Sequence, residues 1–260
     1  MFIAILYFHV MIRFLFVALI CCLSSASVLG NPEPAIAHQQ KPQPDFYTSV
    51  TELLQQYVRN GQVKYKELQK DNLKLDRLAR QVASFEVSKA SPSERKAFYI
   101  NAYNILVLKQ VMEHYPLKSV MDIPGFFDRQ KYKVAGEELT LNELENKKLR
   151  APFKDARIHF ALVCAAKSCP PLLNKAYTPQ KVENQLETQT RLALQDPSFI
   201  RVLPQQRQVQ VSEIFKWYEP DFLAEAESIL SYINKYRAKP LPQQYKQGYY
   251  TYDWALNEVK

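Results

Sequence analysis

Apolar residues recur at helical spacing along much of the chain and predict a series of helices. The first covers residues 46–59, and a second pattern of the same kind covers residues 66–85. The clearest start is Ser91-Pro92-Ser93-Glu94, which offers an N-cap serine, a proline at the first helical position and a capping-box glutamate. This third helix must end before Pro116. Because apolar residues cover most of its circumference, we expect it to be central and buried.

Shorter apolar runs predict a few strands and further helices. Strands are expected at residues 63–65, 132–134, 158–163 and 208–211, and the run at 158–163 is the most convincing of them. Helices are expected at residues 141–149, 178–194, 214–218 and 221–236. The aromatic tail at residues 249–256 is expected to pack back onto the core. Helices with a few short strands indicate an α+β fold, as a single helix-rich domain with a small sheet.

The N-terminal residues predict export. A positively charged segment around Arg13 precedes an unbroken apolar run at residues 14–23, and small residues suited to a signal peptidase follow. We assign residues 1–30 to a signal peptide, 31–44 to a proline-rich linker and 45–260 to one domain. An uncleaved anchor is the alternative, because about 20 apolar residues span a bilayer. The expected location is secreted or periplasmic, with membrane contact only through this segment if it stays uncleaved.

Composition excludes several classes of protein. The 260 residues include 47% apolar residues, which is ordinary for a globular protein. The 5 glycines are too far apart for a phosphate-binding loop, and no G-x-S-x-G elbow is present. The formal net charge of +8 on an exported chain indicates a solvated basic face, or an anionic envelope surface as partner, rather than nucleic acid. Nothing in the sequence implies a cofactor.

Candidate chemistry gathers around two cysteines and one histidine. Two of the 4 cysteines lie in the signal peptide, so the mature domain keeps Cys164 and Cys169. In an oxidising compartment these two are first expected to form a disulfide. Alternatively, Cys164 follows the end of the predicted strand, where nearby Lys167 favours a thiolate that could act as a nucleophile. His159 then serves either as a buried structural residue or as a general base.

A metal site would have to use the same side chains. His159, Cys164 and Cys169 could supply three zinc ligands with an acidic fourth. The C-x2-C pairs typical of structural zinc are absent, however, so we predict no metal.

Two amides stand out on the predicted central helix. Asn101 and Asn104 lie three positions apart on one side of it. A buried amide must be hydrogen-bonded or it destabilises the fold. These residues therefore either hold the backbone of a neighbouring loop or line a site.

Four segments together resemble the domain-of-unknown-function 547 family. They are Phe98–Asn104, His159–Pro170, Ser212–Phe222 and Tyr252–Asn257. The resemblance runs from about residue 45 to the end of the chain, and it implies a papain-like or transglutaminase-like cysteine hydrolase. In that family the first cysteine, here Cys164, is constant, whereas the second can be serine. The family often has histidine where this chain has Asn146, directly after the matching Glu145; if that histidine were the base, His159 would be its only substitute.

Two functions remain open, and the first is enzymatic. It is an exported cysteine-dependent hydrolase or amidotransferase that acts on peptide or amide bonds of a peptide-like or small-molecule substrate. Cys164 would be the nucleophile and His159 the base, with Glu145 orienting it. Substrate contacts would come from Asn101 or Asn104 near the oxyanion and from Asp253 of the closing motif.

The second function is a non-catalytic binding domain of the cell envelope. In it a Cys164–Cys169 disulfide staples the turn, and His159 is a buried structural residue. Asn101 and Asn104 would then hold loops in place.

Overall fold

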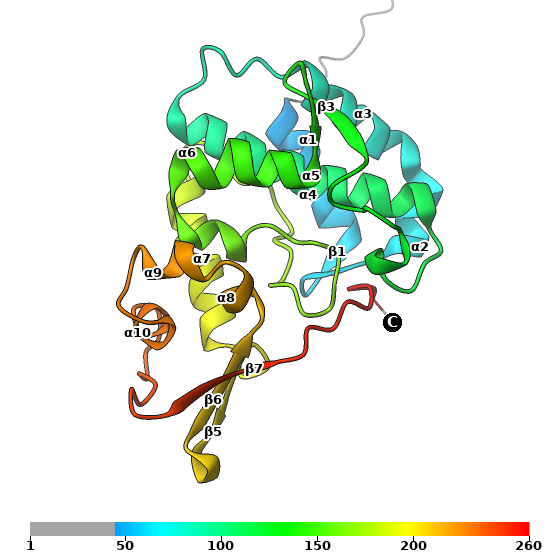
Figure 1. Ribbon diagram of the computed structural model, residues 1–260. Coiled ribbons are helices and arrows are strands. Elements are labelled where there is room, and N and C mark those ends of the chain that lie inside the picture. Colours follow the sequence, from blue (N-terminus) through cyan, green and yellow to red (C-terminus); the bar gives the residue numbers. More distant parts are fainter. Residues whose placement is uncertain (1–44, 260) are drawn as a thin grey trace, which may run out of the picture. The chain divides into compact units, whose positions relative to one another are not determined.

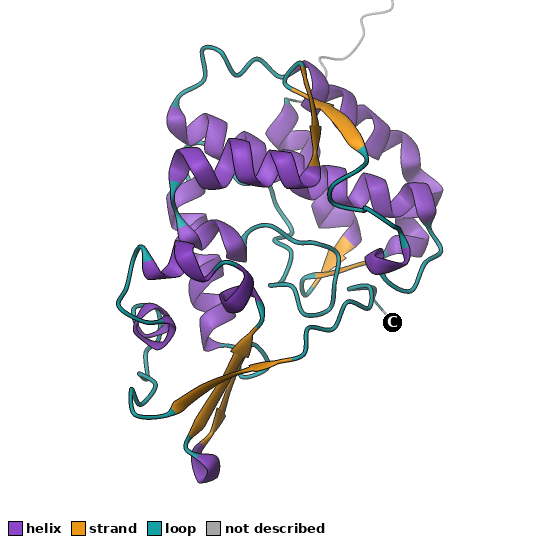
Figure 2. Ribbon diagram, viewed as in Figure 1, coloured by secondary structure: helices purple, strands orange, loops and turns teal. Residues whose placement is uncertain are grey.

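The computed structural model describes residues 45–259, so the predicted signal peptide and linker lie outside the described residues. These residues belong to one compact unit, Gln43–Lys260. Figure 2 shows that helices dominate it and that strands are few and short. The strands form two two-stranded sheets and one three-stranded sheet. The α+β fold class is therefore confirmed. None of the helices among residues 45–259 is long and apolar enough to cross a membrane.

The N-terminal part of the domain is a layer of helices around α4 (Figure 1). Its helices are α1 (Phe46–Tyr57), α2 (Tyr65–Leu68), η1 (Gln69–Asp71), α3 (Asn72–Ser84) and α4 (Pro92–His114). The Ser91 side chain accepts the Glu94 N–H at 3.2 Å, so α4 begins where its cap predicts. Most of the α4 side chains are buried, as expected for a central helix. The helix predicted at residues 66–85 is present but interrupted by the 3-10 turn η1.

Two short β-hairpins also belong to this part of the domain. They are β1 (Val58–Arg59) with β2 (Gln62–Val63), and β3 (Lys131–Val134) with β4 (Glu137–Thr140), both antiparallel. Gly61 turns the first hairpin with a φ of +78°, and a Cβ there would lie 2.5 Å from Cβ of Pro171. Only glycine fits both the backbone conformation and this close approach. The short helix η2 (Val120–Asp122) lies between α4 and β3 in the chain.

The predicted helix at residues 141–149 is a continuous helical segment with an unusual centre. It consists of α5 (Leu141–Glu143), the π-helix η3 (Leu144–Arg150) and α6 (Ala151–Phe153). A capping box begins it, because Thr140 accepts the Glu143 N–H at 3.1 Å while Glu143 accepts the Thr140 N–H at 3.0 Å. π-Helical turns are rare and often mark functional sites.

The strand predicted at residues 158–163 is wrong. The segment forms the 3-10 helix η4 (Ala156–Phe160) and then an irregular stretch. Asp155 caps η4 by accepting the Arg157 N–H at 3.1 Å. Every residue from Ile158 to Val163 is buried. A short run that is buried on all sides carries no periodicity by which a strand differs from a helix, which explains the error.

The C-terminal part combines helices with the three-stranded sheet, which Figure 1 shows at the opposite end of the domain from α1 and α3. Its elements are α7 (Val182–Gln195), β5 (Ile200–Leu203), η5 (Pro204–Gln206), β6 (Gln208–Ser212), α8 (Ile214–Trp217), α9 (Glu219–Leu223), α10 (Ile229–Asn234) and β7 (Lys246–Tyr250). Strand β6 pairs antiparallel with β5 and parallel with β7. The single helix predicted at residues 221–236 is wrong, because Ser228 caps a new helix within it.

The chain end returns to the helical layer, as predicted from its aromatic residues. The Leu256 N–H donates to the Lys118 carbonyl at 2.9 Å, and the Asn257 N–H donates to that of Ala165 at 3.0 Å. This tail lies between two hydrophobic cores, one in the helical layer and one around the three-stranded sheet. Trp254 and Cys169 pack against both cores. The boundary between the cores is therefore where side chains from distant parts of the chain meet.

Candidate functional site

A pocket of about 480 Å³ brings Glu145, His159 and Cys164 together. Each comes from a different element: Glu145 from η3, His159 from η4 and Cys164 from the loop after η4. Glu145 and His159 are buried, and Cys164 is half-buried. The three predicted catalytic residues thus line one cavity, although the strand that was expected to place two of them does not exist.

His159 is held by a carboxylate that the sequence interpretation did not choose. Its Nε2 lies 2.7 Å from Oδ2 of Asp221, and its ring stacks on Tyr218 with centroids 4.0 Å apart. Arg150 donates two hydrogen bonds to the same carboxylate, from Nε to Oδ2 at 2.7 Å and from Nη2 to Oδ1 at 3.0 Å. The group that orients His159 is therefore Asp221 rather than Glu145. Because Nε2 pairs with Asp221, Nδ1 is the ring nitrogen left for another partner.

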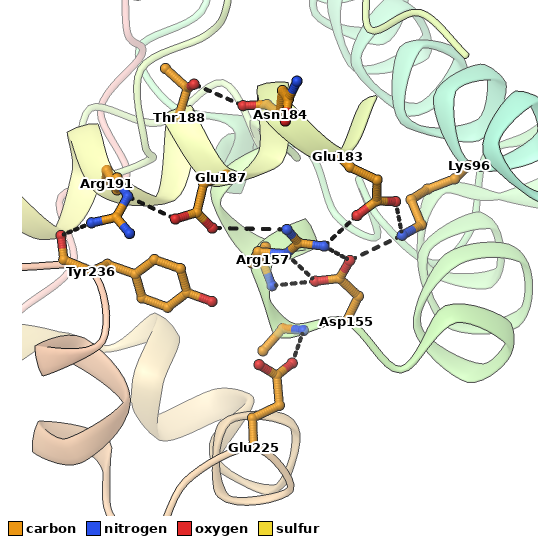
Figure 3. Close-up of polar contacts among 11 residues, drawn as sticks. Lys96, Asp155, Arg157, Glu183, Asn184, Glu187, Thr188, Arg191, Glu225 and Tyr236 are labelled. Atoms are coloured by element: carbon orange, nitrogen blue, oxygen red, sulfur yellow. Dashed lines mark hydrogen bonds and ion pairs between the residues drawn. The ribbon is translucent and has the colours of Figure 1, made fainter. Parts of the chain in front are cut away.

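The helix that carries His159 is anchored by a network of ion pairs (Figure 3). Lys96 of α4 lies 3.0 Å from Asp155 and 2.7 Å from Glu183 of α7, and Arg157 of η4 also pairs with both carboxylates. Burial alone would raise the pKa of Asp155, but Arg157 and Lys96 together lower it. The charged form is thus favoured, and η4 is fixed between α4 and α7 at the residue that caps it.

Asn146 joins the chain of contacts behind His159. It donates to the Asn142 carbonyl at 2.9 Å, and its Oδ1 accepts a hydrogen bond from Arg150. The residue where the family often has histidine therefore supports Arg150, which in turn binds Asp221. Asn146 acts on the site through two other side chains and is not among the described residues that line the pocket.

Glu145 lies beside two phenols at the pocket wall. Burial raises the pKa of Tyr103, and the charge of Glu145 raises it further. Burial likewise raises the pKa of Tyr218, again with a contribution from Glu145. Both tyrosines consequently keep their protons at neutral pH and can donate hydrogen bonds.

Cys164 and Cys169 form a disulfide, with their Cα atoms 6.4 Å apart. The hydroxyl of buried Tyr252 donates to Sγ of Cys169 at 3.2 Å and lies 3.3 Å from Sγ of Cys164. Burial raises the pKa of Tyr252, so the phenol stays protonated. Cys164 faces the large pocket, whereas Cys169 lines a second pocket of about 370 Å³. The bond therefore separates two cavities.

The predicted substrate contacts of Asn101 and Asn104 are corrected by the structure. Asn101 bonds the N–H and the carbonyl of Tyr177 at 3.0 and 2.8 Å, and Asn104 bonds the Ala161 carbonyl and the Val163 N–H, both at 2.9 Å. Neither amide is among the described residues that line the large pocket. Their polar atoms are committed to loop backbone, which was the alternative interpretation of both residues.

Asp253 lies on the other side of the disulfide. It is exposed, lines the second pocket and accepts the Ala255 N–H at 3.0 Å. Its backbone N–H donates to Oγ of Ser168 at 2.8 Å. Its neighbours Tyr252 and Trp254 line the large pocket instead. The closing motif therefore contributes to the large pocket through Tyr252 and Trp254, and not through Asp253, which was selected from it.

Within the described part of the chain, no group of three or more His, Cys, Asp or Glu side chains is arranged to hold a metal ion. The polar groups of the large pocket include a disulfide sulfur, a histidine paired with a carboxylate, tyrosine hydroxyls, the Asn142 amide and the carboxylates of Glu145 and Asp128. After reduction of the disulfide, the sulfur, the histidine and the hydroxyls could serve as the nucleophile, the oriented base and the hydrogen-bond donors that thiol chemistry needs.

Residues 87–192 match the family model described as "Protein of unknown function, DUF547". This segment belongs to the DUF547 family. The match includes Phe98–Asn104 and His159–Pro170 and ends before the segments at residues 212–222 and 252–257. The comparisons with curated proteins and with solved structures gave no match. The family description states no function, so the chemistry of the DUF547 domain must be argued from its pocket.

The pairing of Asp221 predicts a pH dependence of stability for the domain at residues 45–259. The hydrogen bond from His159, together with Arg150, holds the pKa of Asp221 below its usual range. An unfolded aspartate titrates near pH ~3.9. The stabilisation is therefore present above that pH and is lost as the pH falls through it toward the lower folded value. Urea unfolding should show a larger gap between wild type and Asp221→Asn at pH 7 than at pH 3; an equal gap would contradict this pairing.

Proposed function

We propose that this protein is an exported cysteine-dependent hydrolase or amidotransferase that acts on peptide or amide bonds. The observation that carries the proposal is the contact of 2.7 Å between His159 and Asp221 in a pocket that Cys164 also lines. A carboxylate that holds one imidazole nitrogen orients the ring and stabilises its protonated form. That arrangement is expected of a catalytic base.

The reaction begins with reduction of the Cys164–Cys169 bond. A dithiol reductant reduces this bond and is itself oxidised to a disulfide, which leaves Cys164 and Cys169 as thiols. His159 then accepts the proton of the Cys164 thiol, and the thiolate sulfur adds to the substrate carbonyl carbon. As the carbon–nitrogen bond breaks, His159 returns the proton to the leaving amine. The product of this half-reaction is a thioester on Cys164.

A second half-reaction releases the acyl group. Water attacks the thioester in a hydrolase, or a second amine does so in an amidotransferase, while His159 takes the proton of the attacking group. As the carbon–sulfur bond breaks, His159 gives this proton to the leaving sulfur, so that Cys164 returns to its thiol form and His159 to its neutral form. Tyr252, whose hydroxyl is 3.3 Å from Sγ of Cys164, can donate a hydrogen bond to the thiolate during both steps. These roles are the ones expected of a papain-like or transglutaminase-like enzyme.

The proposal is tested by turnover of a library of N-acyl peptide aminocoumarin amides. With a dithiol present, the protein should release aminocoumarin from a subset of the library, and rapid acid quenching should trap an acyl group on the peptide that contains Cys164. Without the reductant, both signals should be absent. If reduced protein releases no amine and accumulates no acyl adduct, the proposal is wrong.

The disulfide favours a second candidate, a non-catalytic binding domain of the cell envelope. In that function the Cys164–Cys169 bond is permanent, and the Tyr252 hydroxyl contacts Sγ of Cys164 at 3.3 Å and Sγ of Cys169 at 3.2 Å. Both candidates predict that neither cysteine is alkylated in the resting protein, so they are separated only by comparing the oxidised with the reduced protein. A binding domain retains its ligand affinity whether or not the bond is reduced, whereas the enzyme acts only after reduction.

A further inference from the structure

The large pocket has a wall of aromatic rings, of which the proposed chemistry uses only the hydroxyl of Tyr252. Trp217 stacks on Trp254 with centroids 5.6 Å apart and an interplanar angle of 23°. Tyr252 lies 4.9 Å from Trp217 and 4.7 Å from Trp254, so the three rings form one continuous surface. Trp217 is 43% exposed, which is unusual for so large an apolar side chain. Exposed aromatic surface beside a pocket is typical of a ligand-binding site.

The charge inside the pocket is negative, in contrast to the chain as a whole. Glu145 and the exposed Asp128 line it, and no lysine or arginine is among the described residues that do so. The whole chain carries 34 Lys and Arg against 26 Asp and Glu. An acidic, aromatic cavity in a basic protein is therefore a local feature that composition alone does not explain.

Glu145 is the least expected of these groups. It is 7% exposed, and no cation lies in ion-pair distance of it among residues 45–259. Arg150 interacts electrostatically with Glu145, but its guanidinium group is hydrogen-bonded to Asp221. A buried carboxylate is costly unless a positive charge or hydrogen bonds compensate it, and Glu145 has hydrogen bonds from two neutral phenols, Tyr103 and Tyr218, but no ion-pair partner among the described residues. A cation supplied by a ligand would complete its surroundings.

We propose that this pocket binds the ammonium-bearing side chain of a peptide-like ligand, with the alkyl stem against Trp217 and Trp254 and the charged head near Glu145. Aromatic faces attract cations through their quadrupoles, and a lysine-like stem covers apolar surface while its head remains polar. A neutral apolar side chain would satisfy the rings but leave Glu145 without a counter-charge. An acidic side chain would meet Glu145 and Asp128 as like charges. The inference names a substrate class for the proposed hydrolase and rests on it only in taking this pocket as the functional site.

The experiment uses intrinsic fluorescence, because both of the 2 tryptophans of the chain line the pocket. The oxidised full chain is titrated with N-acetyl-lysine methylamide and with N-acetyl-norleucine methylamide, which has a similar stem without the charge. With Cys164 kept in its disulfide, binding is measured apart from turnover. We expect the lysine probe to bind about tenfold more tightly. Equal affinities for the two probes, or no fluorescence change with either, would overturn the inference.

A charge-removing variant and its control test the role of Glu145. Glu145→Gln keeps oxygen and shape, and it should reduce the affinity for the lysine probe to that for the norleucine probe. Glu213→Gln, at a carboxylate outside the lining set that accepts the Tyr252 N–H at 3.0 Å, should keep the preference. The preference of the wild-type protein should also weaken as salt rises. A preference that survives in Glu145→Gln at every salt concentration would contradict the assignment of the charged head.

The two proposals can fail separately. A lysine preference in the oxidised protein, without turnover after reduction, would retain the cation pocket and remove the hydrolase. Turnover after reduction, with no difference between the lysine and norleucine probes, would retain the hydrolase and remove the cation pocket.

Discussion

Cys164→Ser is expected to lower the turnover of amide substrates by roughly 10³-fold or more, because a serine hydroxyl in a site built for a thiol is a far weaker nucleophile at neutral pH. The contact of 2.7 Å between His159 and Asp221 remains in the variant. An oriented base does not, however, replace the sulfur nucleophile that the substitution removes. The measurement is the rate of aminocoumarin release by reduced wild-type and variant protein with the same substrate.

Cys169→Ser is the matched control for this change. Both substitutions break the same disulfide, so both should lose about 2 kcal/mol of stability, the value for a short closed loop. Both also replace a sulfur that the Tyr252 hydroxyl contacts, at 3.3 and 3.2 Å. Only Cys164 lines the large pocket, however. Cys169→Ser should therefore remain active and no longer require a reductant, and equal inactivation of the two variants would contradict the assignment of the nucleophile.

The helices were the most predictable part of the fold because their signals are local. Ser91, Pro92 and Glu94 mark the start of α4 within four residues, and the hydrogen bond from Glu94 to Ser91 confirms it. The segment at residues 158–163 was predicted wrongly for the opposite reason. Its conformation depends on Asn104 of α4, which bonds the backbone of Ala161 and Val163 from a position 57 and 59 residues away. A contact at that separation leaves no mark on the apolar pattern.

The candidate site was predictable in its residue types but not in its partnerships. Composition left few histidines and cysteines, so Cys164 and His159 could be selected without a fold, whereas Glu145 was selected from the family resemblance; the structure brings all three into one pocket. The partner of His159 was missed, because Asp221 lies 62 residues away and its sequence position indicates only the start of a helix. The available signal was its place directly before Phe222 in a segment that resembles the family.

The wrong strand did not prevent a correct grouping, for a physical reason. A strand would have pointed His159 and Cys164 by alternation, whereas the 3-10 helix and the following irregular stretch turn the chain between them. On a strand the two residues, five positions apart, would have pointed to opposite faces, so only a fold-back of the following turn could have brought them together. Burial and charge pairing then decided the orientation, through Tyr218, Asp221 and Arg150.

Asn104→Ala is expected to destabilise the domain by roughly 2–5 kcal/mol, a large fraction of the ~5–15 kcal/mol that separates folded from unfolded states of most domains. Asn104 is 4% exposed, and it bonds both the carbonyl of Ala161 and the N–H of Val163 at 2.9 Å. Truncation leaves both backbone groups buried without these partners, and it also opens a cavity beside α4. The quantity to measure is the free energy of unfolding from urea titrations at pH 7.

Asn184→Ala supplies the comparison, since it removes the same amide from an exposed position of α7. Its effect should stay within about 0.5 kcal/mol, the range of most surface substitutions. Similar losses in the two variants would mean that the amide of Asn104 does not hold the loop. The position of the loop matters for chemistry, because Val163 directly precedes Cys164. Asn104→Ala should consequently lower turnover even at temperatures where the variant remains folded, so that a residue first considered for substrate contact would affect the reaction through the backbone it supports.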